Sequence, residues 1–422
     1  MELGSVIKVN PEQARRDYPY EEIEYIDISS VGSGILHETK QIEFANAPSR
    51  AKRIIRNGDT VLATVRPNLR AFWFAQNIKE NTIVSTGFAV LRANEEADPR
   101  FIYYTVTNRL FTDYLTANAK GAAYPAVDTE TIERANVYLP PLPIQRKIAA
   151  ILSAYDDLIE NNLRRIRILE EMAQMIFKSW FIDFEPFKDT GLVKSELGPI
   201  PKGWRVGTIN DCIDFHNGYA FKSKALIDHE VIDSYRVFKM GHIKKGGGLN
   251  SEGTKSWIPK IDCRHLGKYV LKKGDLLMCM TDMKGSVALL GHTALMNEND
   301  VYIVNQRVGV LRANNPFGID YTYLYLLTNS RPFIENLRSR ANSGVQVNLS
   351  TSEIKATKIV IAPKDDNMEF NEIVKPMIEM IFEITKRNQL LSSMRDLLLP
   401  KLISGEVDVS ELDIKVPEEV AI

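Results

Sequence analysis

Apolar residues recur at steps of three and four positions in two long stretches of the chain, one central and one near the C-terminus. The central stretch places Ile148, Ile151, Tyr155, Leu158, Ile166, Leu169, Ala173, Ile176 and Trp180 in one register. The later stretch does the same with Phe370, Ile373, Met377, Met380, Ile384, Leu391, Arg395, Leu398 and Leu402, Arg395 being its polar member. This spacing, sustained over several heptads, is typical of coiled-coil helices. We therefore predict two long helices, over residues 143–185 and 364–404.

Each predicted seam contains one asparagine near its middle, Asn162 in the first helix and Asn388 in the second. A polar residue in an apolar seam costs stability but fixes the register of the paired helices. In an antiparallel pair these two side chains lie opposite each other, so we expect a hydrogen bond between them; two unrelated surface asparagines are the alternative. Pro376 also interrupts the second pattern. Because proline costs about 3 kcal/mol in a helix interior, we expect this helix to begin or kink there.

The segments that precede the two helices repeat each other about 220 residues apart. "IIRNGDTVLATV" (54–65) matches "VLKKGDLLMCMT" (270–281), and "FAVLRA" (88–93) matches "VGVLRA" (308–313). Gly-Asp before a short apolar run is typical of a turn that enters a strand, and the stretches that follow have helical spacing. The chain therefore predicts two similar α+β units, each followed by a long helix. We assign residues 1–142 and 186–363 to these units, and 405–422 to an acidic tail.

The composition, with 44% hydrophobic and 25% charged residues, is that of an ordinary soluble protein. No apolar run reaches the length of about 18 residues that a membrane span requires, and the N-terminal segment lacks the basic start and apolar core of a signal peptide. The three cysteines form no C-x-x-C pair, which argues against a disulfide framework and for a reducing compartment. We therefore expect a cytoplasmic protein without membrane contact.

The formal net charge of -1 conceals an uneven distribution of charge. Residues 200–363 contain 14 Lys and 8 Arg against 9 Asp and 5 Glu, a net charge of +8, whereas residues 1–142 have a net charge of -2. Basic surface attracts nucleic-acid phosphates because each neutralised phosphate releases counterions. A solvated lysine-rich face is the competing interpretation.

The motifs of common catalytic sites are absent from the sequence. There is no G-x-x-x-x-G-K-[ST] loop, no G-x-G-x-x-G, no G-x-S-x-G and no H-x-x-x-H grouping, and "KKGGGLNSEG" lacks the lysine position of a phosphate loop. Asp59 and Asp275 occupy matching places after glycine, but a Gly-Asp turn explains them more simply than a nuclease site does. We expect no catalytic residue, metal site or cofactor in this chain.

Several motifs resemble the specificity subunits of type I restriction–modification enzymes. They are "LPPLPIQRKIAAILSAYDDLIENN" after the first unit, "NGYAFKS" (217–223), the loops "GAAYPAVD" and "SGVQVNLS", and "RDLLLPKLISGEVDV" (395–409). The resemblance covers nearly the whole chain. The first unit has no "NGYAFKS" counterpart, and the second helix begins with "APKDDNMEFNEIV" instead of a second Pro-Pro-Leu-x-x-Gln.

This resemblance implies a non-catalytic reader of double-stranded DNA. Two target recognition domains would each read one half of a bipartite, asymmetric site, and two antiparallel helices would set the distance between the halves. Two adenine-N6 methyltransferase subunits carrying S-adenosylmethionine would dock on the helices, and restriction/translocase subunits using ATP and Mg²⁺ would join them. A subunit of a related system outside type I, a nuclease or methyltransferase fragment, and a coiled-coil scaffold are the alternatives.

Residues that could contact DNA lie in polar or glycine-containing loops. Arg and Lys favour guanine in the major groove, whereas Asn and Gln favour adenine. The candidates are Arg66, Asn68, Arg70, Lys120 and Tyr124 in the first unit and Lys222, Lys284, Gln346 and Asn348 in the second. For partner docking, the apolar candidates after the first helix are Trp180, Phe181, Phe184 and Phe187, with packing against the neighbouring domain as the alternative.

Overall fold

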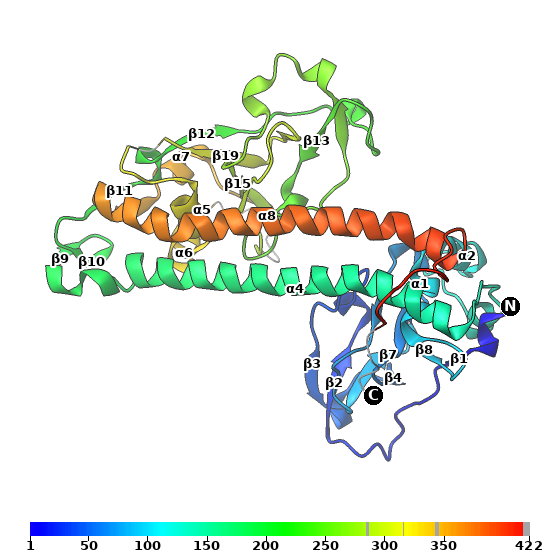
Figure 1. Cartoon of the computed structure of the whole chain (residues 1–422). Helices are drawn as coiled ribbons and strands as arrows, with labels where there is room; N and C mark the ends of the chain where they lie inside the picture. Colours follow the sequence, from blue (N-terminus) through cyan, green and yellow to red (C-terminus); the bar gives the residue numbers. More distant parts are fainter. Residues whose placement is uncertain (284–286, 315, 342–345, 417–422) are drawn as a thin grey trace. The chain divides into compact units, whose positions relative to one another are not determined.

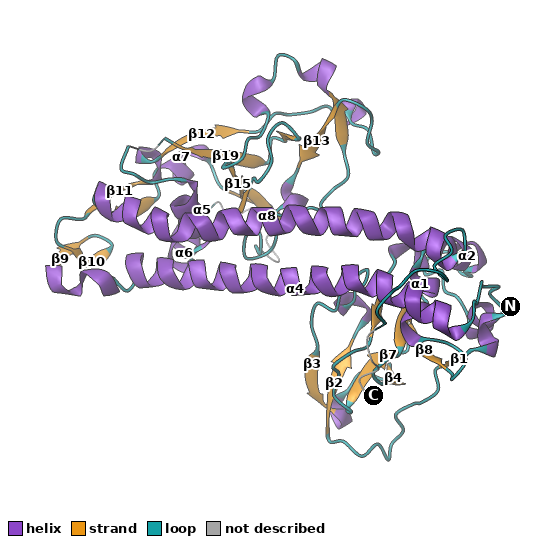
Figure 2. Ribbon diagram, viewed as in Figure 1, coloured by secondary structure: helices purple, strands orange, loops and turns teal. Residues whose placement is uncertain are grey.

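The computed structural model of the 422-residue chain describes residues 1–283, 287–314, 316–341 and 346–416. It forms two compact units, coloured along the sequence in Figure 1. Unit 1 consists of Met1–Asn162 and Arg387–Ile422, and unit 2 consists of Leu163–Lys386. Each unit contains both sheet and helix (Figure 2), as the repeated pattern predicts. None of the helices in the described part of the chain has the length and apolar character needed to cross a bilayer.

Unit 1 contains two four-stranded sheets and three short helices. One sheet has the order β1-β8-β5-β6, formed by Ile7–Val9, Phe88–Ala93, Thr60–Ala63 and Phe72–Phe74. The other has the order β3-β2-β7-β4, formed by Lys40–Glu43, Glu22–Ile26, Thr82–Ser85 and Ala51–Ile54. The short helices are α1 (Pro99–Thr107), α2 (Arg109–Asn118) and α3 (Thr129–Glu133).

Unit 2 repeats this plan with additions. Its sheets are β12-β19-β15-β17 (Ile213–Asn217, Val308–Ala313, Leu276–Cys279, Thr293–Leu295) and β14-β13-β18 (Trp257–Pro259, Ser234–Phe238, Tyr302–Val304). Its short helices are α5 (Tyr321–Asn329), α6 (Arg331–Ser339) and α7 (Thr351–Lys355). Three strand pairs complete it: β9-β10 (Leu192–Ser195, Gly198–Pro201), β11-β21 (Arg205–Thr208, Lys358–Ile361) and β16-β20 (Thr281–Met283, Gln346–Asn348).

The two long helices are α4 (Leu142–Phe181) and α8 (Lys364–Ile403), each of 40 residues. Their bounds agree closely with the predicted ranges, but α8 begins twelve residues before Pro376 and continues through it. Pro376 is exposed, so water can hydrogen-bond the carbonyl that lacks a helical partner. Asp365 and Asp366 in the first turn favour the start of α8 because they complement the helix dipole.

Amide side chains attach the start of each long helix to its own unit. In unit 1, Gln145 accepts a hydrogen bond from the backbone N–H of Asp98 (2.9 Å) and donates to the carbonyl of Pro140 (2.8 Å). In unit 2, Asn367 donates to the carbonyls of Phe317 and Ala362, both at 3.0 Å. The second helix therefore lacks the Pro-Pro-Leu-x-x-Gln motif but retains its amide contact.

The predicted hydrogen bond between the two seam asparagines is confirmed. Asn162 Nδ2 donates to Asn388 Oδ1 at 2.7 Å, and both side chains are buried within unit 1. The prediction that Leu158, Ile373 and Met380 face the partner helix is wrong, because these three side chains are exposed. An α-helix has 3.6 residues per turn, so a strict heptad pattern drifts around its surface by about 20° per heptad.

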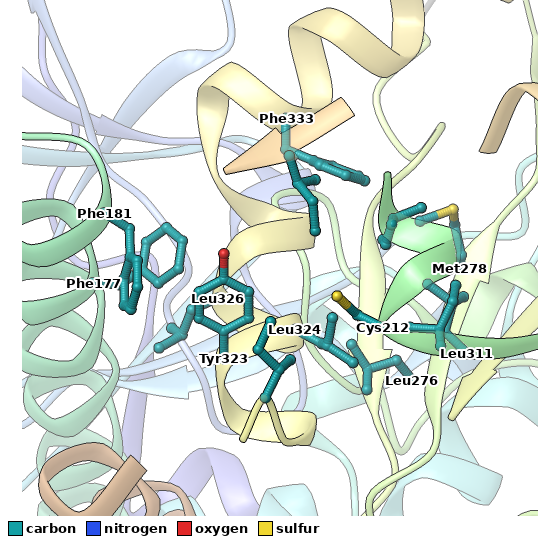
Figure 3. Packing of buried hydrophobic residues seen from close by; sticks show 14 of the residues in the cluster. Phe177, Phe181, Cys212, Leu276, Met278, Leu311, Tyr323, Leu324, Leu326 and Phe333 are labelled. Carbon is teal, nitrogen blue, oxygen red and sulfur yellow. The ribbon is translucent and has the colours of Figure 1, made fainter. Parts of the chain in front are cut away.

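The aromatic residues proposed for partner docking pack in or against the core of unit 2, which corrects that prediction in favour of its alternative, packing against the neighbouring domain. Phe181 is buried, and Trp180, Phe184 and Phe187 pack against the same cluster. The rings of Phe181, Phe184 and Phe187 pack around the Trp204 ring, with centroids 5.6, 5.4 and 4.8 Å from its centroid. Figure 3 shows Phe177 and Phe181 of α4 beside Tyr323 of α5. Burial of Phe181 contributes about 1.5–3 kcal/mol, and the three partly buried side chains contribute less.

Candidate nucleic-acid interface

Two loops of unit 1 that were predicted to contact DNA lie side by side. Val65 forms a β-bridge with Ala126, and the backbone N–H of Arg66 donates to the carbonyl of Pro125 at 2.7 Å. Gly121 has a φ of +105°, and a Cβ there would lie 3.2 Å from the Tyr124 carbonyl oxygen. Glycine therefore allows the second loop to fold back closely on itself. The fold joins residues about 60 positions apart into one surface.

Arg66 and Tyr124 form the centre of this surface. The Arg66 guanidinium lies over the Tyr124 ring, 4.6 Å from its centroid, and donates to the Ala123 carbonyl at 3.2 Å. Arg66 has a φ of +50°, a conformation that is uncommon for non-glycine residues and recurs at functional sites. Tyr124 and Asn68 are exposed. A guanidinium held against an aromatic ring is well oriented for guanine or for base stacking.

Arg70 has a structural role instead of the predicted DNA contact. Its guanidinium donates to the Thr112 hydroxyl and to the Thr107 carbonyl, each at 2.9 Å. Burial lowers the pKa of Arg70 from its ordinary value. Arg70 therefore attaches the loop to α1 and α2, and we no longer expect it to read a base.

Lys120 stands at the base of the second loop and remains highly exposed. Its ammonium lies 3.1 Å from Asp128 Oδ2. Hydrogen bonds from Thr131 and from Lys120 lower the pKa of Asp128 to about 2, so this carboxylate is ionised at neutral pH. Asp128 also caps α3 by accepting from the backbone N–H of Thr131. A lysine so exposed can exchange this surface ion pair, which is worth little, for a DNA phosphate.

Unit 2 joins its corresponding loops through a short strand pair. β16 and β20 are antiparallel, with Thr281 opposite Asn348 and Met283 opposite Gln346. Asn348 is exposed, and its Oδ1 accepts a hydrogen bond from the Thr281 hydroxyl at 2.9 Å. Lys284 and the side chain of Gln346 lie outside the described residues.

Lys222 lies in a different part of unit 2. It is exposed and precedes the 3₁₀ turn Ser223–Ala225, in a segment whose Tyr219 ring packs 5.3 Å from Tyr269. Gly218 allows this segment to approach the sheet, because a Cβ there would lie 2.1 Å from the Asn305 carbonyl oxygen. The "NGYAFKS" motif is therefore chiefly structural, with Lys222 at its exposed end.

Exposed apolar side chains next to both pairs of loops were missed by the sequence reasoning. Leu69 is 66% exposed beside Asn68, and Met283 is 60% exposed at the end of β16. An apolar side chain in the major groove can contact the methyl group of thymine. In the sequence, the feature that points to Leu69 and Met283 is a large apolar residue inside an otherwise polar loop.

Asp59 and Asp275 are confirmed as turn residues. Arg92 Nε lies 2.8 Å from Asp59 Oδ1, and Arg312 Nε lies 2.8 Å from Asp275 Oδ1. Each aspartate also accepts a backbone N–H three residues earlier, from Arg56 or Lys272. These carboxylates are already satisfied, and the described residues contain no group of three or more side chains suited to a metal ion.

Both long helices expose apolar residues at matching positions. The repeat relates Leu158 to Met380, Ile168 to Leu390, Met172 to Met394 and Met175 to Leu397, each 222 residues later. All eight are between 39% and 70% exposed. Three of the four positions are spaced i, i+4, i+7, so they share one helix face. We call these three residues of each unit its apolar stripe: Leu390, Met394 and Leu397 in unit 1, and Ile168, Met172 and Met175 in unit 2.

Comparison with known proteins gives the family. A model described as a type I restriction modification DNA specificity domain matches this chain twice, at residues 1–171 and 201–391. The chain belongs to this family. The two matches coincide with the two repeats, and the proteins of this family are the DNA-recognition subunits of their systems and are not enzymes themselves.

Relatives of this specificity subunit match over most of their length. The MjaIX specificity subunit of Methanocaldococcus jannaschii is 28% identical over 368 residues, covering 85% of this chain and 80% of the relative. The HindI specificity subunit of Haemophilus influenzae is 22% identical over 423 residues, covering 85% and 89%. The crystal structure of the type I S subunit from M. genitalium has a TM-score of 0.56 at 14% identity, covering 96% and 95%, and shares the fold.

Proposed function

We propose that this specificity subunit reads a bipartite, asymmetric DNA site, one half with each unit. The observation that carries the proposal is the repeated junction of two loops, Val65 with Ala126 in unit 1 and β16 with β20 in unit 2. The same construction presents different side chains in the two units. Two similar supports with different reading residues suit a target whose halves differ in sequence.

The side chains at the two junctions match the chemistry of base edges. Arg66 with Tyr124 in unit 1 favours guanine or a stacked base, and Asn348 in unit 2 favours adenine. Lys120 is suited to a phosphate, which contributes affinity without sequence preference. Lys222 and Lys284 remain candidates for the same backbone contacts.

The paired helices are suited to set the distance between the half-sites. Each unit is attached to both helices by a buried core, with Ile148 and Leu402 in unit 1 and Phe177 and Phe370 in unit 2. A helix of 40 residues extends about 60 Å at about 1.5 Å per residue. Because helix length is fixed by residue number, the spacing between two readers can be encoded in the helices.

The apolar stripes are suited to dock two copies of one partner. A surface that recurs in both units offers the same chemistry twice, and exposed apolar patches of this kind mark interaction sites. The partner that we propose is the adenine-N6 methyltransferase subunit, which would bring S-adenosylmethionine. Restriction/translocase subunits, with ATP and Mg²⁺, would join this complex.

Mapping N6-methyladenine tests the whole proposal. The chain is co-expressed with the methyltransferase subunit from the same genome in cells that lack other adenine methylation, and methylated sites are sequenced. We expect one motif made of two different half-sites with a constant gap. Methylation at a single undivided motif, or at none with a partner shown to be active, would contradict the proposal. Expression of the methyltransferase alone is the control and should give no motif.

A further inference from the structure

Among the described residues, a buried hydrogen bond and a partly buried ion pair join α4 to α8 within unit 1. The first is the hydrogen bond between Asn162 and Asn388. In the second, Arg395 forms an ion pair with Asp156, which also accepts a hydrogen bond from the Tyr104 hydroxyl at 2.7 Å. The Arg395 and Asp156 side chains are 27% and 26% exposed, so both ions are largely removed from water.

The repeat places apolar residues at every equivalent position of unit 2. The helices α4 and α8 begin 222 residues apart, as do α1 and α5. By this offset, Asn162 corresponds to Ile384 and Asn388 corresponds to Ile166. For the second contact, Asp156 corresponds to Ile378, Arg395 to Ala173 and Tyr104 to Leu326. Ile378, Ala173 and Leu326 belong to one buried hydrophobic cluster. The polar contacts of unit 1 are therefore replaced, position by position, by apolar packing.

The polar residues of unit 1 distinguish α4 from α8, whose apolar seams are otherwise similar. Each has apolar residues at matching seam positions, such as Ile148 and Phe370. An apolar seam by itself discriminates poorly between partners of similar shape. A second copy of the chain could therefore offer its own α4 to α4, or its own α8 to α8.

Such pairing between copies removes the partner that each polar group has on the other helix, although Arg395 keeps its contact with Asp396 on α8 and Asp156 keeps its hydrogen bond from Tyr104. In an antiparallel pair of two α4 helices, the offset places Asn162 opposite Ile166 and Asp156 opposite Ala173. In a pair of two α8 helices, Asn388 meets Ile384 and Arg395 meets Ile378. Each pairing leaves a buried amide facing an apolar residue and breaks the ion pair between the helices, and both losses are penalised, so both pairings are disfavoured relative to α4 with α8.

We propose that Asn162, Asn388, Asp156 and Arg395 determine the choice of helix partner: they favour pairing of α4 with α8 and reject the same helix of a second copy. The asparagine pair is not optimised for stability, since Asn388 Nδ2 is buried and has no hydrogen-bond partner among the described residues. A residue pair kept at such a cost fits a role in selectivity. The proposal concerns assembly alone and does not depend on what DNA the chain reads.

Exchange between two differently tagged full-length copies tests the proposal. The copies are co-expressed, one tag is captured, and the amount of the other tag is measured, with light scattering on the purified chain to give its mass. The variant Asn162→Ile with Asn388→Ile introduces the residue type that unit 2 has at these positions. We expect it to raise the co-captured fraction at least about tenfold over wild type, with a dimer in light scattering. Exchange at the wild-type level by a folded variant would overturn the proposal.

The reverse variant distinguishes selective helix pairing from non-specific association through added apolar surface, which we call stickiness. Ile166→Asn with Ile384→Asn makes the chain more polar, but it also gives each helix a matching amide on a second copy. Partner choice predicts that exchange rises here too, whereas stickiness predicts a fall, and a fall would overturn the proposal. Thermal unfolding followed by circular dichroism establishes that each variant is folded. If the reverse variant does not fold, the first variant alone decides the outcome.

Discussion

The guanidinium of Arg395 on α8 forms an ion pair with Asp156 on α4, with Nη1 2.5 Å from Oδ1. Burial would lower the pKa of Arg395, but the neighbouring carboxylates of Asp156 and Asp396 raise it above its ordinary value. The Arg395 guanidinium therefore stays protonated at physiological pH. It connects the two helices to α1 through the Tyr104 hydroxyl.

Removing Arg395 should destabilise unit 1 measurably. Arg395→Ala leaves the Asp156 carboxylate largely buried without its counter-ion, and we expect the free energy of unfolding to fall by about 2 kcal/mol or more. Arg331→Ala is the matched control, because Arg331 forms an exposed ion pair with Glu335 on α6. Its effect should stay within about 0.5 kcal/mol. Urea denaturation measures both, and equal effects would show that the Arg395 pair is an ordinary surface contact.

A double-mutant cycle should reveal the coupling between Asn162 and Asn388. Either Asn162→Leu or Asn388→Leu alone leaves one buried amide facing an apolar side chain, and we expect a loss of about 1–3 kcal/mol. The double variant should be close to neutral or more stable, because an apolar layer replaces the amide pair. Urea denaturation of the four proteins gives the coupling energy. Additive losses would mean that the two amides do not depend on each other.

The loop residues should separate into base readers and phosphate contacts. Arg66→Ala with Tyr124→Ala should relax the preference at one half-site, by about 1–3 kcal/mol for each base that is no longer read, and leave the other half-site unchanged. Asn348→Ala should do the same at the other half-site. Lys120→Ala should weaken binding to all sequences alike and reduce the salt dependence by about one phosphate. Binding of DNA variants by the methyltransferase complex, measured at several salt concentrations, distinguishes these outcomes.

The apolar stripes should bind partners independently. Met172→Glu with Met175→Glu should remove one partner copy, and Met394→Glu with Leu397→Glu should remove the other. These side chains are exposed, so the stability of the chain should change by no more than about 0.5 kcal/mol. Ile232→Glu is the control, because Ile232 is 99% exposed and lies outside both stripes. Native mass spectrometry counts the bound copies, and full occupancy in both double variants would rule out the stripes as the docking surface.

The stability of unit 2 should depend on pH through His242. Burial lowers the pKa of His242 to about 4, and its ring stacks on Phe238 with centroids 5.0 Å apart. The unfolded chain takes up a proton near its ordinary pKa of about 6.5, whereas the folded chain does not. Unfolding is therefore favoured increasingly as the pH falls from about 6.5 to about 4, by up to about 3 kcal/mol.

His242→Asn tests this dependence. The Asn side chain offers an acceptor in place of Nδ1, which accepts from the backbone N–H of Lys239 at 3.1 Å, but it does not titrate. The variant should be less stable at neutral pH because it is smaller, and its pH profile should be flatter between pH 6.5 and 4. An unchanged slope would assign the pH dependence to other groups.

The spacing of apolar residues was sufficient to predict the positions of the two long helices, but it did not predict what each helix surface contacts. The ends of α8 agree with the predicted range because Pro363 and the polar "KDD" that follows it mark its start. Whether Phe181 meets a partner or a core depends on Trp204 and Phe370, which are distant in sequence. The structural contacts of Arg70 are not predictable from the sequence, because its acceptors Thr107 and Thr112 lie on helices that the loop meets only after folding.

The distance between equivalent elements of the two repeats is not constant along the chain. It is 212 residues from the start of β2 to that of β13, 216 from β5 to β15 and 220 from β8 to β19. From α1 and α5 onward it is 222, and it stays at 222 through α3 and α7 and both long helices. Since the two repeats diverged, gains and losses of residues between these elements have therefore accumulated only before α1 and α5. The two units therefore differ in length only in their N-terminal, strand-rich parts, whereas the helices that follow keep one spacing.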